Sequence, residues 1–236
     1  MTTDEKLDEL LKVYNRISLL SDKNGCKVIK ICHKELEKNL VVHILPKENS
    51  VYQTLCQIRH KNLPAIYDVF NLTDGTIVLE EYIEGLTVAE ICDSGKYKKR
   101  GAIKIARELC FALSVLHENN IVHRDIKPEN IMVDNFGRVV LIDFDASRRI
   151  SLSSQDTTII GTVGYASPEQ LGITQSDART DIYAVGILLN TLITGNHPSV
   201  KMAKGRIGKV IKKCTAINPD NRYQTAIKLA RALFFA

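Results

Sequence analysis

The sequence predicts an α+β protein with two lobes, a small β-rich lobe over residues 1–84 and a larger, mainly helical lobe over residues 85–236. The first third of the chain contains short segments rich in β-branched and aromatic residues, separated by turn-forming stretches. The remainder contains apolar residues repeated at helical spacing. Between the two textures, IEGL at 83–86 is too short for a linker, so we expect a hinge within one domain.

The β-rich lobe is expected to begin with a short helix. Thr2 and Glu5 have the spacing of a capping box. The apolar residues after them fall on one helical face: Leu7, Leu10, Leu11 and Tyr14. Strands are then predicted at 27–32, 40–45, 65–70 and 76–83, with one helix around VYQTLCQI at 51–58. Together they predict a small antiparallel sheet with an inserted helix.

The second lobe contains two long apolar repeats that predict buried helices. They comprise Ile103, Ala106, Leu109, Cys110, Leu113 and Leu116, and further on Ile182, Val185, Leu188, Leu189 and Leu192. At 236 residues and 44% hydrophobic, the chain is long enough to bury a core in each lobe.

Composition excludes several classes of protein. The net charge of +5 is modest and gives no reason to expect nucleic-acid binding. The six cysteines show no C-x-x-C pair, so we expect neither disulfides nor zinc. The N-terminus lacks an apolar signal core, and no stretch approaches the roughly 18 to 20 apolar residues of a membrane span. A cytoplasmic protein is therefore expected.

Three motifs carry the chemistry: IVHRDIKPENIMV at 121–133, VVLIDFDAS at 139–147 and GTVGYASPEQ at 161–170. Their order and spacing resemble those of the protein kinases, whose fold is two-lobed. Lys127 within HRDIKPEN is the form typical of the serine/threonine class. The SPEQ and NPDNRYQTA segments resemble most the bacterial kinases of the eukaryotic (Hanks) type.

The resemblance implies a role for each matched residue. Asp125 would accept or orient the substrate hydroxyl, and Lys127 would contact the transferred phosphate. Asn130 and Asp143 would hold Mg²⁺, or Mn²⁺, that bridges the phosphates of ATP.

Three further matches imply structural roles. Glu169 is expected to pair with Arg222, and Asp181 to brace the backbone of the HRD segment.

The β-rich lobe departs from the family pattern at the phosphate-binding residues. The segment LVVHIL at 40–45 matches the strand whose lysine holds the α and β phosphates, and His43 occupies the lysine position. Val51 stands where the helix glutamate would pair with that lysine, and Glu80 stands at the gatekeeper position. The glycine-rich loop matches SDKNGC at 21–26, where Ser21, Lys23 and Cys26 replace the three glycines and Gly25 is displaced.

Three alternatives for the missing lysine remain open. His43 and Glu80 could form a pair, because the gatekeeper lies close to the strand lysine. Lys23 in the loop or Lys30 in the strand could instead supply the charge. Without any such role, His43 is a hydrogen-bonded core residue and both lysines are solvated. The residues expected to contact ATP are Leu20, Lys23, Val28, Val41, His43, Glu81, Ile83 and Met132.

The helical lobe departs from the pattern in two places. Asp145 replaces the glycine of the D-F-G motif, so we expect a less mobile loop. The chain after TGNHP at 194–198 is too short for the helix and loops that kinases usually carry there. The segment 148–162 matches the activation segment, and possible phosphoacceptors that Arg124 could read are Ser151, Ser153, Ser154, Thr157 and Thr158.

The leading function is ATP-dependent phosphorylation of protein serine or threonine, or autophosphorylation, because the residues nearest the transferred group are intact. Low efficiency is expected. The alternative is a pseudokinase that acts as a scaffold or nucleotide sensor for a signalling partner. A small-molecule kinase is less favoured, because SPEQ and GTVGY resemble a peptide-positioning loop.

Overall fold

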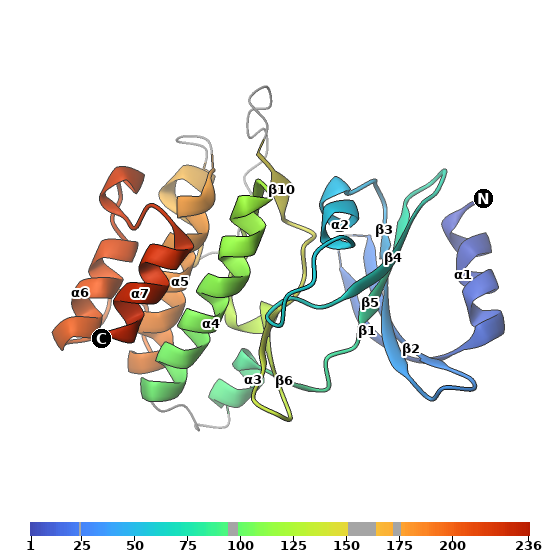
Figure 1. Cartoon of the computed structure of the whole chain (residues 1–236), viewed down its shortest axis with the longest axis horizontal. Helices are drawn as coiled ribbons and strands as arrows, with labels where there is room; N and C mark the ends of the chain where they lie inside the picture. The colour runs from blue at the N-terminus through green and yellow to red at the C-terminus, as the bar shows by residue number, and fades with distance from the viewer. Residues whose placement is uncertain (24, 94–98, 151–163, 172–175) are drawn as a thin grey trace. The chain divides into compact units, whose positions relative to one another are not determined.

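The computed structural model describes residues 1–23, 25–93, 99–150, 164–171 and 176–236. The chain forms two compact units. The first contains Met1–His60 and Pro64–Glu84, and the second contains Lys61–Leu63 and Gly85–Ala236. A β-sheet dominates the first unit and helices dominate the second (Figure 1), which confirms the predicted α+β class.

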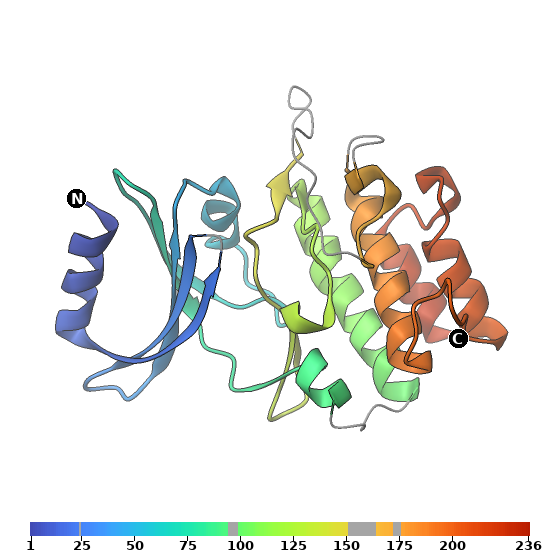
Figure 2. The same cartoon turned by 180° about the vertical axis from the view of Figure 1, so that it is seen from behind.

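The first unit is built on one antiparallel five-stranded sheet in the order β1-β2-β3-β5-β4. The strands are β1 (Tyr14–Lys23), β2 (Cys26–His33), β3 (Asn39–Leu45), β4 (Ile66–Asn71) and β5 (Thr76–Glu81). The helix α1 (Thr3–Val13) lies on one face of this sheet and α2 (Ser50–Leu55) on the other (Figures 1 and 2).

The face under α1 holds the core of the first unit. Leu10 of α1 packs on alternate residues of three neighbouring strands: Ile29, Ile31, Leu40, Val42, Ile77 and Leu79. The predicted capping box starts this helix, because the Thr2 hydroxyl accepts from Glu5 N and the Glu5 carboxylate accepts from Thr2 N.

At the start of the chain, one prediction was wrong and one strand was missed. Tyr14 is extended and begins β1, and does not belong to the helix. The strand β1 itself was not predicted, because its side chains are mostly exposed and their pattern lacks a clean alternation. Register shifts between Arg16 and Ser18 and between Leu19 and Ser21 interrupt its pairing with β2, which explains the missing alternation.

Other boundaries differ by a few residues. The helix α2 ends at Leu55, and β5 ends at Glu81, so Tyr82 and Ile83 lie beyond the strand. Residues 61–63 join the second unit because the Asn62 amide donates to Val139 O, and Leu141 N donates to Asn62 O.

The second unit contains four packed helices, with the buried α5 in contact with each of the other three (Figure 2). These are α4 (Lys99–Glu118), α5 (Ala178–Thr194), α6 (Gly205–Cys214) and α7 (Ala226–Phe234). The apolar residues predicted at helical spacing are buried in α4 and α5, except the half-buried Ile103. The smaller elements are β6 (Gly85–Thr87), α3 (Val88–Asp93), β7 (Ile121–Val122), η1 (Pro128–Asn130), β8 (Ile131–Asp134), β9 (Val139–Leu141), β10 (Arg148–Arg149), η2 (Pro168–Leu171) and η3 (Pro219–Asn221).

Candidate active site

The HRD segment of the second unit is held by one buried carboxylate. Asp181, in the first turn of α5, accepts hydrogen bonds from His123 N at 3.0 Å and Arg124 N at 2.8 Å. Its Oδ2 also lies 2.8 Å from the Nε2 of His117 on α4. Burial raises the pKa of Asp181, but the bonds and charge from His117 and His123 lower it by more, so the carboxyl pKa lies below its ordinary value.

This anchoring fixes an unusual backbone conformation. Arg124 has a φ of +68°, in the left-handed region that side chains other than glycine rarely adopt. Such strain persists only where neighbouring bonds determine it. The bond from Arg124 N to Asp181 does this, together with a bond from the Gln170 amide to Arg124 O at 2.7 Å.

Asp125, Lys127 and Asn130 form one hydrogen-bonded cluster. The Lys127 ammonium lies 2.6 Å from Asp125 Oδ2. The Asn130 amide donates to the same oxygen at 2.9 Å and to Asp125 O at 3.0 Å. The three are positioned by the chain between β7 and β8, where η1 turns the PEN sequence back toward Asp125. The carboxylate of Asp125 is thus oriented by two donors.

Asp143 lies two residues after the end of β9, and a backbone bond from its neighbour Ile142 reaches this cluster. Ile142 N donates to Asn130 O at 2.9 Å, which brings the backbones beside Asp143 and Asn130 together. Asp143 has a φ of +65°, and its Oδ1 accepts from Asp145 N at 3.2 Å. Asp145 is exposed, and its φ is not in the positive range.

The segment after Asp143 is tied to the HRD segment at several points. The buried ring of Phe144 meets that of His123 edge-on, with the centroids 5.3 Å apart. The Arg124 guanidinium donates to Ala146 O at 2.8 Å. Further along, Arg148 and Arg149 of β10 pair with β7. The predicted phosphoacceptors at 151–158 lie outside the described residues.

A buried ion pair connects η2 to the turn before α7. Arg222 is 2% exposed and binds both carboxylate oxygens of Glu169, at 2.5 and 2.9 Å. The hydroxyl of Thr180 donates to the same carboxylate. Burial raises the pKa of the Glu169 carboxyl, but the bonds and charge from Arg222 and the other donors lower it by more. The pKa therefore lies below its ordinary value of 4.5. The structure thus brings together Glu169 and Arg222, while Asp181 bonds to the backbone of the HRD segment.

The first unit carries His43 on the sheet face opposite the α1 core. Val28, His43 and Val78 are neighbours across three strands, as are Lys30, Val41 and Glu80. Because paired residues share a face and side chains alternate along a strand, these two rows point to the same side.

His43 and Glu80 are in contact on this face. The His43 Nε2 lies 3.4 Å from the Glu80 Oε2, with side chains only 7% and 4% exposed. The ring of Tyr52 from α2 lies 5.9 Å from the His43 ring, and Val51 beside it is buried. The helix α2 thus presents an aromatic side chain to His43, and the carboxylate comes from β5. Sequence reasoning did not find Tyr52.

The two candidate lysines have surroundings of their own. The Lys30 ammonium lies over the ring of Tyr82, 4.0 Å from its centroid. Lys23 is exposed at the end of β1, where it pairs with Cys26 of β2, and Gly25 has a φ of +78°. In the described part of the segment matched to the glycine-rich loop, the two strands therefore stay paired as far as Lys23 and Cys26.

The other residues expected to contact ATP occupy varied environments. Leu20 is 49% exposed at the irregular part of β1, whereas Val41 and Ile83 are buried. Val28 and Glu81 are half-buried, and the Glu81 carboxylate accepts from Ala65 N. Met132, in β8 of the second unit, is also half-buried.

These elements and motifs define a protein kinase domain, and comparison with known proteins shows the same. The family described as the protein kinase domain matches residues 12–233. The chain therefore belongs to this family.

Among its relatives is serine/threonine-protein kinase PknB of Mycobacterium leprae, 30% identical over 84% of this chain and 38% of the relative. Serine/threonine-protein kinase PrkC of Bacillus subtilis is 32% identical over 74% of this chain and 31% of the relative. The chain thus spans less than two fifths of the length of either. The predicted resemblance to bacterial kinases of the eukaryotic type is confirmed. None of the helices described in the structure is long and apolar enough to cross a membrane.

Proposed function

We propose that the chain transfers the γ-phosphoryl group of ATP to serine or threonine hydroxyls of proteins, its own included, at low efficiency. The observation that carries this proposal is the cluster of Asp125, Lys127 and Asn130, whose hydrogen bonds orient one carboxylate. Positioning and charge neutralisation account for most of the catalysis of phosphoryl transfer, and this cluster supplies both.

Each residue then has a defined task. The substrate hydroxyl oxygen forms a bond to the γ-phosphorus while the bond from that phosphorus to the β–γ bridging oxygen breaks, and ADP leaves. The proton of the hydroxyl passes to Asp125. Lys127, which is one-fifth exposed beside Asp125, neutralises charge on the transferred group.

The residues at this site fit a Mg²⁺ ion, or Mn²⁺ in its place. The Asn130 amide nitrogen is directed at Asp125, so the amide oxygen is the atom that suits a hard cation, together with the Asp143 carboxylate. When bound, the cation supplies charge neutralisation at the ATP phosphates. The conformation that presents Asp143 is held by its bond from Asp145 N.

The low efficiency follows from the first unit. Nucleotide contacts are proposed for its residues Leu20, Lys23, Val28, Val41, His43, Glu81 and Ile83, and for Met132 of the second unit. Where the family has a lysine, this sheet presents an imidazole with a shorter reach, already in contact with Glu80. We assign residues 1–84 and 85–236 to the two lobes of one catalytic domain.

A second candidate is a pseudokinase that binds nucleotide without transferring phosphate, as a scaffold or sensor in the cytoplasm. The observation that favours it is the burial of the His43–Glu80 pair, because a carboxylate beside the imidazole offsets any positive charge that His43 could offer to phosphates. The intact cluster around Asp125 favours the enzyme.

Incubation with radiolabelled ATP and Mg²⁺ tests the proposal, with casein-like substrates and with the chain alone. Label on serine or threonine that disappears in Asp125→Ala supports the kinase. Label no greater than that of Asp125→Ala, combined with a thermal shift on adding ATP, identifies the nucleotide sensor and overturns the proposal. An Asp8→Ala variant is the matched control, because Asp8 is exposed on α1, away from the proposed nucleotide contacts.

A further inference from the structure

The positive charge of this chain is concentrated near its C-terminal end. Residues 200–236 contain nine Lys and Arg against one acidic residue, Asp220. The whole chain contains 32 against 27, so the preceding 199 residues hold 23 against 26 and are net negative. The modest total of +5 therefore conceals two regions of opposite sign.

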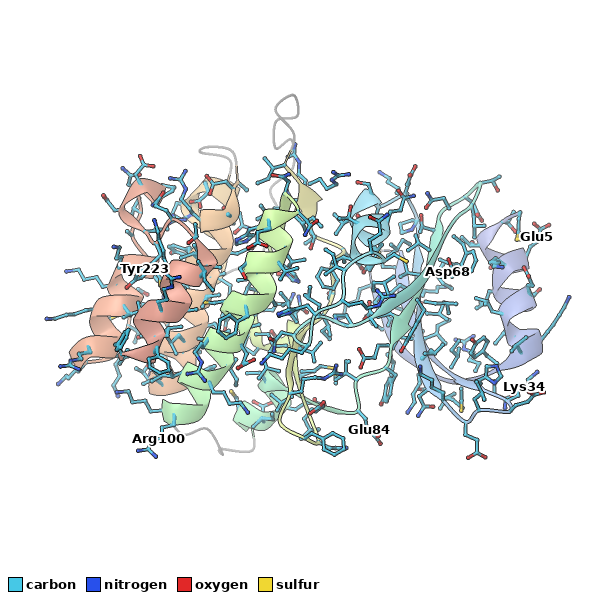
Figure 3. The ribbon with its side chains drawn as sticks, in the orientation of Figure 1. Glu5, Lys34, Asp68, Glu84, Arg100 and Tyr223 are labelled. Atoms are coloured by element: carbon cyan, nitrogen blue, oxygen red, sulfur yellow. The ribbon has the colours of Figure 1, made fainter. Side chains whose placement is uncertain are left out.

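Six of these cations lie in and just before α6. All six are exposed, and we call them the basic face: Lys201, Lys204, Arg206, Lys209, Lys212 and Lys213. No acidic residue interrupts them between 201 and 213. Nitrogen-tipped side chains extend outward from α6 at the left end of Figure 3. Among the residues that the structure describes, no ion pair neutralises any of the six, and Lys213 lies over the ring of Tyr223.

The fold holds this face rigidly. The opposite side of α6 is buried against α5 and α7 through Ile207, Val210 and Ile211. The connection before it contains no helix, and the buried amide of Asn190 fixes it by donating to Asn196 O and Lys201 O, while Ala203 N donates to Asn190 Oδ1. Gly208 allows this connection to lie close, because a Cβ there would meet Ala203 O at 2.0 Å. The charged side of α6 faces solvent.

Exposed apolar side chains lie at both ends of the basic face. Val200 and Met202 precede α6 and are 75% and 36% exposed, and Ile217 follows it at 81%. Cations combined with exposed aliphatic side chains are the chemistry of surfaces that bind the headgroup region of anionic membranes.

The composition of the face distinguishes among anionic partners. Five of its six cations are lysines, which act as point charges without the fork that Arg offers to a single carboxylate or phosphate. Lysine is depleted in protein–protein interfaces, and exposed aliphatic side chains have no partner along a nucleic-acid backbone. We propose that the basic face docks the chain on an anionic phospholipid bilayer, independently of the proposed catalysis.

Cosedimentation with vesicles tests this docking in the unmodified chain. We expect binding to vesicles rich in phosphatidylglycerol, weakened by salt, and little binding to pure phosphatidylcholine. The triple variant Lys204→Gln, Lys209→Gln, Lys212→Gln should bind at least about tenfold more weakly, because each removed charge weakens attraction to the surface. The variant Val200→Ser, Ile217→Ser should also bind more weakly.

The matched control removes three exposed lysines from the first unit: Lys12→Gln, Lys27→Gln, Lys47→Gln. It has the same net charge as the triple variant and should retain binding. Equal losses in the two triple variants would overturn the proposal, as would absence of binding at low salt. Tighter binding to a DNA duplex or to polyglutamate than to the vesicles would overturn it in favour of a nucleic-acid or protein partner. Unchanged thermal unfolding of each variant excludes misfolding as the cause.

Discussion

The His43 Nε2 lies 3.4 Å from the Glu80 Oε2, and both side chains are buried on one face of the five-stranded sheet. The strands β3 and β5 are adjacent, with Val41 opposite Glu80 and His43 opposite Val78. His43 and Glu80 are therefore diagonal neighbours, within reach of each other across the strands. In this chain the carboxylate beside the lysine position belongs to Glu80 of strand β5, whereas in the kinase family it belongs to a glutamate of a helix.

Replacing His43 by Lys should increase phosphoryl transfer. A lysine would place a permanent charge with longer reach beside the same Glu80, and a charge at a transferring phosphoryl group contributes substantially to catalysis. We expect kcat/KM to rise by about tenfold or more, measured with radiolabelled ATP and with ATP affinity from thermal shift.

The controls for this gain are His43→Ala, Lys23→Ala and Lys30→Ala. Because Lys30 lies over Tyr82, its replacement should leave activity nearly unchanged. A steep loss in Lys23→Ala, with no gain in His43→Lys, would identify the loop lysine as the source of charge instead.

Asp181→Asn should weaken both stability and activity. An amide has one acceptor oxygen, so it cannot accept from His123 N and Arg124 N as the two carboxylate oxygens do. A buried donor left without its partner costs about 1–3 kcal/mol, measurable by urea denaturation. The loss of kcat should exceed that expected from unfolding, because the strained Arg124 backbone relaxes. An unchanged kcat in the folded variant would contradict this role.

Glu169→Gln should destabilise the chain by about 3–5 kcal/mol at neutral pH, since it leaves the buried Arg222 without its counter-charge. The pKa of Glu169 in the folded chain lies below 4.5, so its stabilisation is present above that pH and is lost as pH falls below it. Urea midpoints at several pH values should decline less steeply below pH 4.5 in the variant than in the unmodified chain. Parallel declines would show that other carboxyls dominate.

Asp145→Gly should loosen the segment after Asp143. The backbone at Asp145 does not need the freedom of glycine, so the change increases the entropy of the unfolded chain and costs about 0.5–1 kcal/mol. Amide hydrogen exchange of residues 143–147 should become faster. Asp134→Gly does not serve as a control, because the Asp134 carboxylate accepts hydrogen bonds from Phe136 N and Arg138 N and so caps a turn. An exposed position outside the segment, Asn221, offers the matched change Asn221→Gly. Unaltered exchange would mean that the aspartate does not rigidify the loop.

The sequence alone determined the class of protein and its longest helices and central strands. The HRD, DFD and SPE segments have fixed local spacing, so their residues identify the family without coordinates. Long helices such as α4 and α5 were predictable because burial on one side imposes a period of 3.6 on the apolar residues. The strand β1 was not, because an exposed, irregular edge strand imposes no such pattern.

Only the tertiary structure decided which side chains meet. His43 and Glu80 are separated by 37 positions, and Glu169 and Arg222 by 53, so their contacts depend on strand register and helix packing. The same holds for the basic face, because the sequence shows six cations but not that one side of α6 is buried and the other exposed. Local spacing specifies chemistry within a segment, whereas distance between segments is set by which apolar faces are buried together.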